Sequence, residues 1–135
     1  MAENYVVKEP LTDAMIDAGA ELTQKLVDLG LPLYAAFWLW DPDISDDWHL
    51  FFSAPHRELY EGRGLYPKIR PALDGMDEKA KEIVDLALRQ MDDHSALVRA
   101  LRAKYPTGGA VKRIRLRKTM LPGKFVPDGL LYLAN

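Results

Sequence analysis

Three arginines near the carboxyl end of the chain stand at alternate positions, Arg113, Arg115 and Arg117. They alternate with Ile114 and Leu116, and this pattern predicts a β-strand with one buried and one solvent-exposed face. Alternate residues on a strand are roughly 6.5–7 Å apart on one face, so the three guanidinium groups would form a row. A guanidinium binds phosphate or carboxylate through parallel hydrogen bonds and also stacks on aromatic rings. The row therefore predicts a binding surface for an anion.

The residues that could extend this row come from two other segments. Arg99 and Arg102 lie in a predicted helix before the strand, and they would widen the positive patch if the helix packed beside it. Trp38 and Trp40 lie on another predicted strand, where their rings would offer cation–π contacts or base stacking if they shared the face of the row. Large aromatic residues on a central strand are usually buried, so core packing is the competing interpretation for both tryptophans.

The charge of the chain is unevenly distributed, although the net charge is only −2. Residues 1–93 contain nine Lys and Arg against nineteen Asp and Glu, whereas residues 94–127 contain nine Lys and Arg and no acid. Positive charges side by side on a strand repel each other unless a nearby anionic group compensates them. A phosphate or an acidic partner could do so, and so could Asp13, Asp17 and Glu21 of the first predicted helix. Both interpretations stay open, an anionic partner and internal ion pairs of little net value.

The other motifs that could do chemistry are weak. None of the three histidines, His49, His56 and His94, has a metal-ligand spacing such as His-x-x-x-His. The loop at residues 41–47 resembles the start of a calcium loop, but Asp46 stands where such a loop needs glycine. The chain has no cysteine, no phosphate-binding glycine loop and no serine-nucleophile elbow. We therefore assign no catalytic residue, no metal site and no cofactor from the sequence.

The spacing of apolar residues predicts the elements that would carry these side chains. Apolar residues at helical spacing between Thr12 and Gly30 predict a helix over about residues 13–29. Residues 33–40 predict a strand that is apolar on both faces and therefore central in a sheet. Residues 48–53 predict its antiparallel hairpin partner.

The second half of the chain has a less regular pattern. Residues 55–64 are interpreted as a loop, and a short helix interrupted by Pro71 follows. Residues 80–91 fit a helix slightly better than a strand on periodicity alone. A further helix comes next, and strands at residues 111–119 and 130–133 complete the predicted elements.

Several positions together resemble a small uncharacterised bacterial protein family. The residues that carry the resemblance are Leu22, Leu26, Gly30 and Pro32, the run Ala35-Ala36-Phe37-Trp38-Leu39, then Trp48, Leu50, Ser53 and Pro55, and later Tyr66, Ile69, Leu97, Leu101, Gly123, Asp128 and Tyr132. The resemblance covers nearly the whole chain, and residues 121–126 depart from its pattern. It implies a strand at residues 84–91, which favours strand over helix there, and it implies no biochemical activity.

The sequence as a whole predicts one α+β domain over residues 1–135. We expect a mixed or mostly antiparallel sheet of about five strands with helices packed on it. The expected order is helix, strand, strand, short helix, strand, helix, strand, strand. The longest apolar run is too short to span a bilayer and no secretory signal is visible, so we expect a cytoplasmic protein without a membrane partner.

The function that the sequence favours is a non-enzymatic binding or interaction module. Its basic C-terminal surface, from Arg99, Arg102, Arg113, Arg115 and Arg117, would meet a nucleic acid or an acidic protein. One alternative is a homo-oligomer in which acidic and basic surfaces of two copies complement each other. Another is a small enzyme that uses loop carboxylates. The observation that bears most on the choice is whether the arginine row is exposed or covered by acids of the first helix.

Overall fold

The structure is a computed structural model in which residues 10–135 are described, and its first element is the predicted N-terminal helix, α1 (Asp13–Asp28). The helix begins after Thr12, whose Oγ1 accepts a hydrogen bond from the Met15 backbone N–H at 3.2 Å. It ends just before Gly30, whose φ of +81° is the left-handed conformation that a glycine adopts without a Cβ clash. The helix ends within one residue of its predicted boundary, because both caps are local features of the sequence.

Four further helices and five strands follow within residues 10–135. They are β1 (Ala35–Trp40), β2 (His49–Ser53), α2 (His56–Tyr60), α3 (Tyr66–Asp74), α4 (Glu78–Asp85), β3 (Leu88–Gln90), α5 (Ala96–Lys104), β4 (Ile114–Leu121) and β5 (Lys124–Ala134). The sheet has the order β3-β2-β1-β5-β4, with β2 and β3 parallel and the other neighbouring pairs antiparallel. This mixed five-stranded sheet confirms the predicted α+β class.

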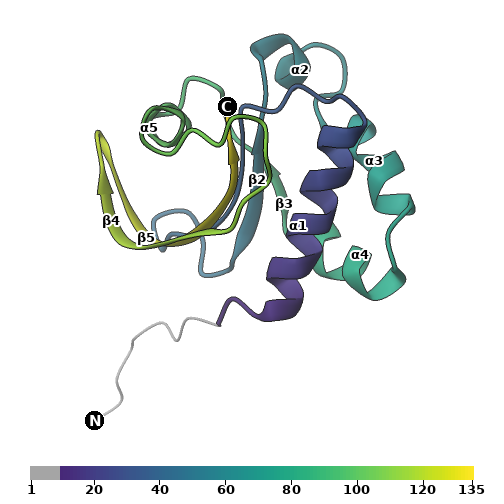
Figure 1. Ribbon diagram of the computed structural model, residues 1–135, viewed down its shortest axis with the longest axis horizontal. Coiled ribbons are helices and arrows are strands. Elements are labelled where there is room, and N and C mark those ends of the chain that lie inside the picture. The colour runs from purple at the N-terminus through teal and green to yellow at the C-terminus, as the bar shows by residue number, and fades with distance from the viewer. Residues whose placement is uncertain (1–9) are drawn as a thin grey trace.

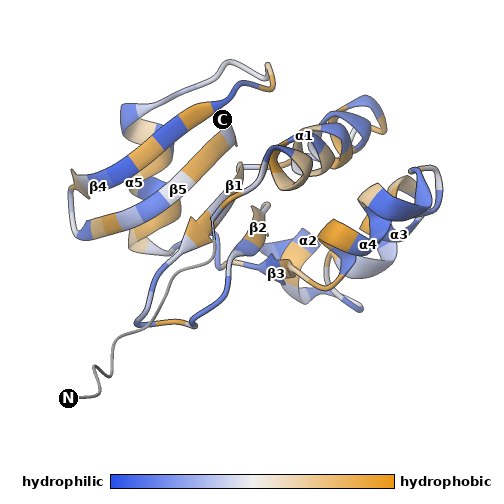
Figure 2. Cartoon of the chain, turned by 90° about the horizontal axis from the view of Figure 1, so that it is seen from below, coloured by the Kyte–Doolittle hydropathy of each residue, from blue (hydrophilic) through white to orange (hydrophobic). Residues whose placement is uncertain are grey.

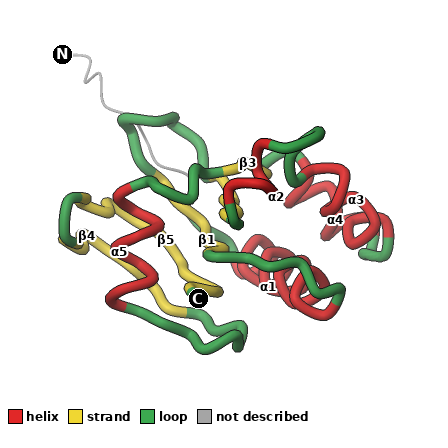
Figure 3. The backbone as a smooth tube through the Cα atoms, turned by 90° about the horizontal axis from the view of Figure 1, so that it is seen from above, coloured by secondary structure: helices red, strands yellow, loops and turns green. Residues whose placement is uncertain are grey.

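Helices cover both faces of the sheet (Figure 1). α1, α3 and α4 pack on one face, where Leu22 and Leu26 of α1 join Trp38 and Tyr132 in the larger hydrophobic cluster. α5 packs on the other face, and its Leu101 belongs to a second cluster with residues of β1, β4 and β5. β1 lies in the middle of the sheet and is buried on both faces, as predicted. Viewed from above, α1 and α5 flank the central strands (Figure 3).

Three segments between β2 and α5 differ in detail from the prediction. Residues 56–60, expected as a loop, form α2, which is too short to show a helical period. α3 continues through Pro71, although proline removes one helical hydrogen bond. Residues 78–85 form α4 and residues 88–90 form β3, so the helix and strand interpretations of residues 80–91 are each correct in part. β3 exists because it pairs with β2, and this long-range contact leaves little trace in a three-residue sequence pattern.

β4 and β5 form a hairpin that curls around α5, and β4 is one edge of the sheet (Figure 1). The turn at Pro122-Gly123 joins the strands, and Gly123 takes the φ of +78° that this kind of turn needs at its second position. Lys118, with a φ of +45°, is the one non-glycine residue of the described chain in the left-handed region. The ribbon reverses its faces there, because Leu116 and Leu121 both lie in the cluster beneath α5 although four residues separate them, a spacing that regular alternation would place on opposite faces.

The side of this hairpin that faces away from α5, here called the convex face, carries the arginine row. Arg115 and Arg117 alternate with apolar residues that point toward α5, and the alternation is visible along β4 in Figure 2. Beyond the reversal of faces, the convex face carries Met120 and Phe125, which are directly opposite each other on the two strands. The predicted one-sided strand is therefore correct in its alternation, but it covers residues 114–121 instead of 111–119 and continues into an apolar pair that the alternation did not predict.

α1 lies close to the sheet at Gly19, next to one buried polar contact. Trp38 Nε1 donates a hydrogen bond to the Tyr132 hydroxyl oxygen at 2.9 Å, and that hydroxyl donates to the Ile16 carbonyl oxygen at 2.5 Å. Burial raises the pKa of Tyr132, so the hydroxyl keeps the proton that it donates. A methyl group at Gly19 would lie 2.5 Å from the Tyr132 oxygen and 2.6 Å from Trp38 Nε1. The glycine in the middle of α1 is therefore required by packing, despite its cost to the helix.

We predict that Gly19→Ala destabilises the protein, although alanine is the better helix former. In an exposed helix this change stabilises by about 1 kcal/mol. Here the added methyl group would overlap the Tyr132 hydroxyl, and overpacking of this kind costs about 1–3 kcal/mol. The measurement is the free energy of unfolding from denaturant titration of the wild type and the variant.

Tyr132→Phe provides the matched background, because it removes the oxygen nearest to the added methyl group. In that background Gly19→Ala should cost less than in the wild type, and the double-mutant cycle measures the difference. An equal cost in both backgrounds would show that the hydroxyl does not set the distance between α1 and the sheet.

Candidate anion-binding surface

Arg113, which immediately precedes β4, forms the outermost ion pair of the row. Its Nη1 donates to Asp17 Oδ1 of α1 at 2.8 Å. Both side chains are more than half exposed, at 53% and 67%. An exposed ion pair of this kind contributes little to stability and is weakened by salt. Arg113 is therefore accessible to another anion.

Arg115 has a structural role. Its Nε and Nη2 donate to the two carboxylate oxygens of Asp128 at 3.0 Å each, and only 4% of the Asp128 side chain is exposed. The guanidinium also lies 5.7 Å from the centre of the Trp48 ring. A bidentate pair with a buried carboxylate is strongly directional, and removing its cation leaves a poorly compensated charge. Arg115 therefore holds Asp128 in place and does not reach outward.

Arg117 is the most accessible member of the row. It is exposed, and its guanidinium forms no ion pair with any residue in the range 10–135. Asp128 is its cross-strand neighbour, but that carboxylate is engaged by Arg115. Lys118 follows it and is also exposed. The predicted row is thus two accessible cations, Arg113 and Arg117, on either side of a structural one.

Internal pairing therefore accounts for part of the charge pattern in the sequence. Asp17 is the α1 acid that meets the row, and Asp128 is the other carboxylate bound to it. Lys124 is paired as well, because its Nζ contacts buried Asp41 at 2.6 Å. The acid-free residues 94–127 still lie together at one end of the molecule, as α5, β4 and the start of β5, while most acids lie on α1–α4 and the 41–47 loop (Figure 1).

The expectation that Arg99 and Arg102 widen the row is corrected by the structure. α5 packs on the opposite face of the sheet from the row, so its arginines lie on a different side of the molecule. Arg99 is exposed there. Arg102 lies 3.8 Å from the centre of the Tyr34 ring and donates from Nε to the Asn135 carbonyl oxygen. A helical pattern predicts which side of a helix is buried, but it leaves open which face of the sheet receives it.

The two tryptophans proposed for stacking have different environments. Trp38 is 1% exposed and belongs to the core, so it cannot stack on a ligand and core packing is the correct interpretation. Trp40 is half-buried and donates from Nε1 to the Asp46 carbonyl oxygen at 3.1 Å. It shares the face of the row, because it pairs with Asp128, which in turn pairs with Arg117.

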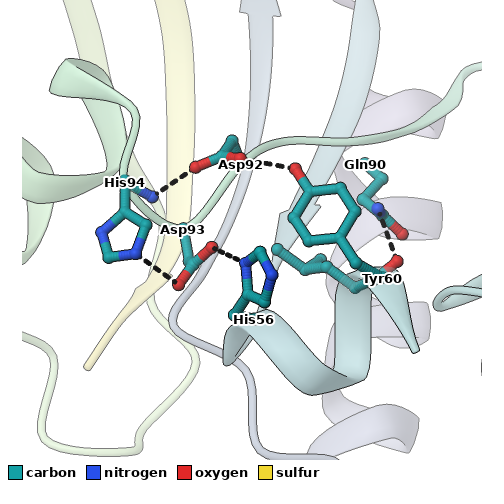
Figure 4. A network of polar contacts seen from close by, with 7 residues as sticks. His56, Tyr60, Gln90, Asp92, Asp93 and His94 are labelled. Atoms are coloured by element: carbon teal, nitrogen blue, oxygen red, sulfur yellow. Dashed lines mark hydrogen bonds and ion pairs between the residues drawn. The ribbon is translucent and has the colours of Figure 1, made fainter.

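A second polar cluster lies between α2 and the start of α5 (Figure 4). The Asp93 side chain, 7% exposed, lies between two imidazoles, with Oδ1 at 3.7 Å from His56 Nδ1 and Oδ2 at 3.6 Å from His94 Nε2. Next to it, Asp92 accepts hydrogen bonds from the Tyr60 hydroxyl at 2.6 Å and from the His94 backbone N–H at 2.7 Å. Sequence analysis missed this cluster, because His56 and Tyr60 are more than thirty residues from Asp92-Asp93-His94 and the two segments meet only in the folded chain.

This cluster holds α2 against the loop that precedes α5. Its contacts join α2 to the loop that leads into α5, where Ser95 Oγ accepts a hydrogen bond from the Val98 N–H at 3.1 Å. Among residues 10–135, no group of three or more His, Asp or Glu side chains is arranged to hold a metal ion. The hydrogen bond from the Tyr60 hydroxyl lowers the pKa of Asp92, so this carboxylate stays ionised.

Two groups that could serve the enzyme alternative as bases, Glu58 and His49, both have a lowered pKa. Glu58 forms an ion pair with Lys68, which lowers its pKa and makes it a weaker base. The pKa of His49 is also lowered, first by burial and then by the charge of Arg89. His49 lies at an open groove of about 410 Å³ between α4 and the β2–β3 edge of the sheet, which Glu82 also lines.

Comparison of the chain with protein-family models, with curated proteins and with solved structures finds no match in any of the three. The resemblance to an uncharacterised bacterial family stays a prediction, as does self-association. Within residues 10–135, no helix combines the length and the apolar character needed to cross a bilayer.

We predict that the three arginines of the row contribute very unequally to stability. Arg115→Ala should lower the free energy of unfolding by about 3 kcal/mol, because Asp128 loses two hydrogen bonds in a buried position. Arg113→Ala and Arg117→Ala should each change it by less than about 0.5–1 kcal/mol, as expected for exposed side chains. Denaturant unfolding of the three variants measures this. A stability for Arg115→Ala equal to that of Arg117→Ala would contradict the structural role.

His49 predicts a specific pH dependence of stability. Its folded-state pKa lies below the ordinary value of 6.5, so the unfolded chain binds the proton more readily than the folded protein. The free energy of unfolding should therefore fall as the pH is lowered from about 7 to about 5, and His49→Gln should reduce this slope. Urea unfolding across this range measures the slope. An unchanged slope in His49→Gln would contradict this assignment.

Proposed function

We propose that the protein is a non-enzymatic binding module whose convex face contacts an anionic polymer. The observation that carries this proposal is the placement of two accessible cations on the convex face, Arg113 immediately before the edge strand β4 and Arg117 within it. Residues four apart on a strand are about 13 Å apart, which is too far for one small anion to bridge. Two such cations suit separate anionic groups of an extended chain.

A protective role for these charges is the simplest competing explanation. Cationic side chains on an edge strand discourage pairing with the edge of another sheet, and this role needs no partner. Both roles can be served by the same residues, but only a binding role predicts loss of affinity on charge reversal. The structure also shows which arginine must be left intact in such a test, since Arg115 supports the fold.

We predict that the double variant Arg113→Glu, Arg117→Glu remains folded and elutes from immobilised heparin at a clearly lower salt concentration than the wild type. Salt weakens the attraction between the cations of the protein and the anionic groups of heparin. The salt concentration at elution therefore reports on the number of contacts between them. Circular dichroism and a thermal melt confirm that the variant is folded.

A matched control has the same change in net charge at the other end of the molecule. Arg63→Glu with Lys79→Glu alters two exposed cations outside the convex face. It should elute like the wild type. Equal losses in both double variants would show that net charge alone governs retention, and a wild type that is not retained would overturn the proposal. Arg99→Glu adds a third comparison, because it probes the opposite face of the sheet.

A further inference from the structure

The convex face carries an exposed apolar pair beside its cations. Met120 and Phe125 lie directly opposite each other on β4 and β5 and are 69% and 44% exposed. Arg117 lies three residues before Met120, at about 10 Å along the strand. The other two large aromatic residues exposed in residues 10–135 differ in kind, because Tyr60 and Tyr66 bind Asp92 and Asp85 through their hydroxyls. Phe125 has no polar group that could engage in this way.

We infer that the anionic polymer is a single-stranded nucleic acid, and that Phe125 stacks on one of its bases while Arg113 and Arg117 contact its phosphates. This inference rests on the proposed function. Surfaces that bind single strands combine cations along the backbone with aromatic rings on which bases stack. Here the β4–β5 hairpin provides both. Residues 94–127 contain no acid that would repel the phosphates, and the two carboxylates bound to the row are Asp17 and Asp128.

The same features disfavour other anionic partners. A duplex keeps its bases stacked inside, so its backbone could meet the arginines but its bases could not meet Phe125. An acidic protein would satisfy the two arginines, but it has no general requirement for an exposed phenyl ring beside the cations. An anionic membrane would accept both the cations and the apolar pair, and it is therefore tested directly.

The experiment measures binding of a fluorescently labelled oligothymidine to the full chain by anisotropy at several salt concentrations. Phe125→Ala should weaken binding by about 5- to 150-fold, the range expected for loss of one stacked base, without changing the salt dependence. Phe125→Trp should bind at least as tightly as the wild type, because it keeps an aromatic plane. Arg113→Glu with Arg117→Glu should reduce the slope of log affinity against log salt by about 1.4. Leu86→Ala, at another exposed apolar residue, is the matched control and should bind like the wild type.

The possible failures of the two proposals are distinguishable. Unchanged oligothymidine binding by Phe125→Ala, or equal competition by a duplex, would overturn the nucleic-acid inference and leave the heparin result for the charge surface intact. Binding to phosphatidylserine vesicles that depends on Phe125, without oligothymidine binding, would overturn it in favour of a membrane surface. If charge reversal affects neither heparin nor oligothymidine binding, the proposed function itself is wrong. Thermal melts of each variant ensure that a loss of binding is not a loss of fold.

Discussion

The Tyr132 hydroxyl, held between the Trp38 indole and the α1 backbone, determines how closely α1 approaches the sheet. Only glycine at position 19 leaves space for this contact. Asp17 lies on the same helix, so the depth at which α1 packs also places this carboxylate within reach of Arg113. A contact in the core thus determines whether the surface ion pair between Arg113 and Asp17 can form.

The row of arginines shows how one residue type serves different purposes on one strand. Arg115 is bound by a buried carboxylate, Arg113 by an exposed one, and Arg117 by none within the described part of the chain. Acids are scarce at this end of the molecule, because residues 94–127 contain none. The internal carboxylates satisfy part of the positive charge and leave two cations accessible at a separation that suits a polymer.

Local features of the sequence predicted much of the fold. The caps of α1, the apolar β1–β2 hairpin and the alternation along β4 each depend on residues close together in the chain. The prediction was poorer for β3 and α2, since a three-residue strand exists only through its pairing with β2 and a five-residue helix has too few residues for a period.

The sequence by itself determined the class of the fold, the alternation that places Arg115 and Arg117 on one face of a strand with Arg113 just before it, and the absence of acids from residues 94–127. The tertiary structure alone decided which of these arginines are engaged, because Asp17 and Asp128 reach them through the packing of α1 and the register of β5. It also decided that α5 lies on the far face with Arg99, and that Phe125 stands exposed on the near one. Caps and alternation arise from neighbouring residues, whereas ion pairs and exposure arise from segments that meet only in the folded chain.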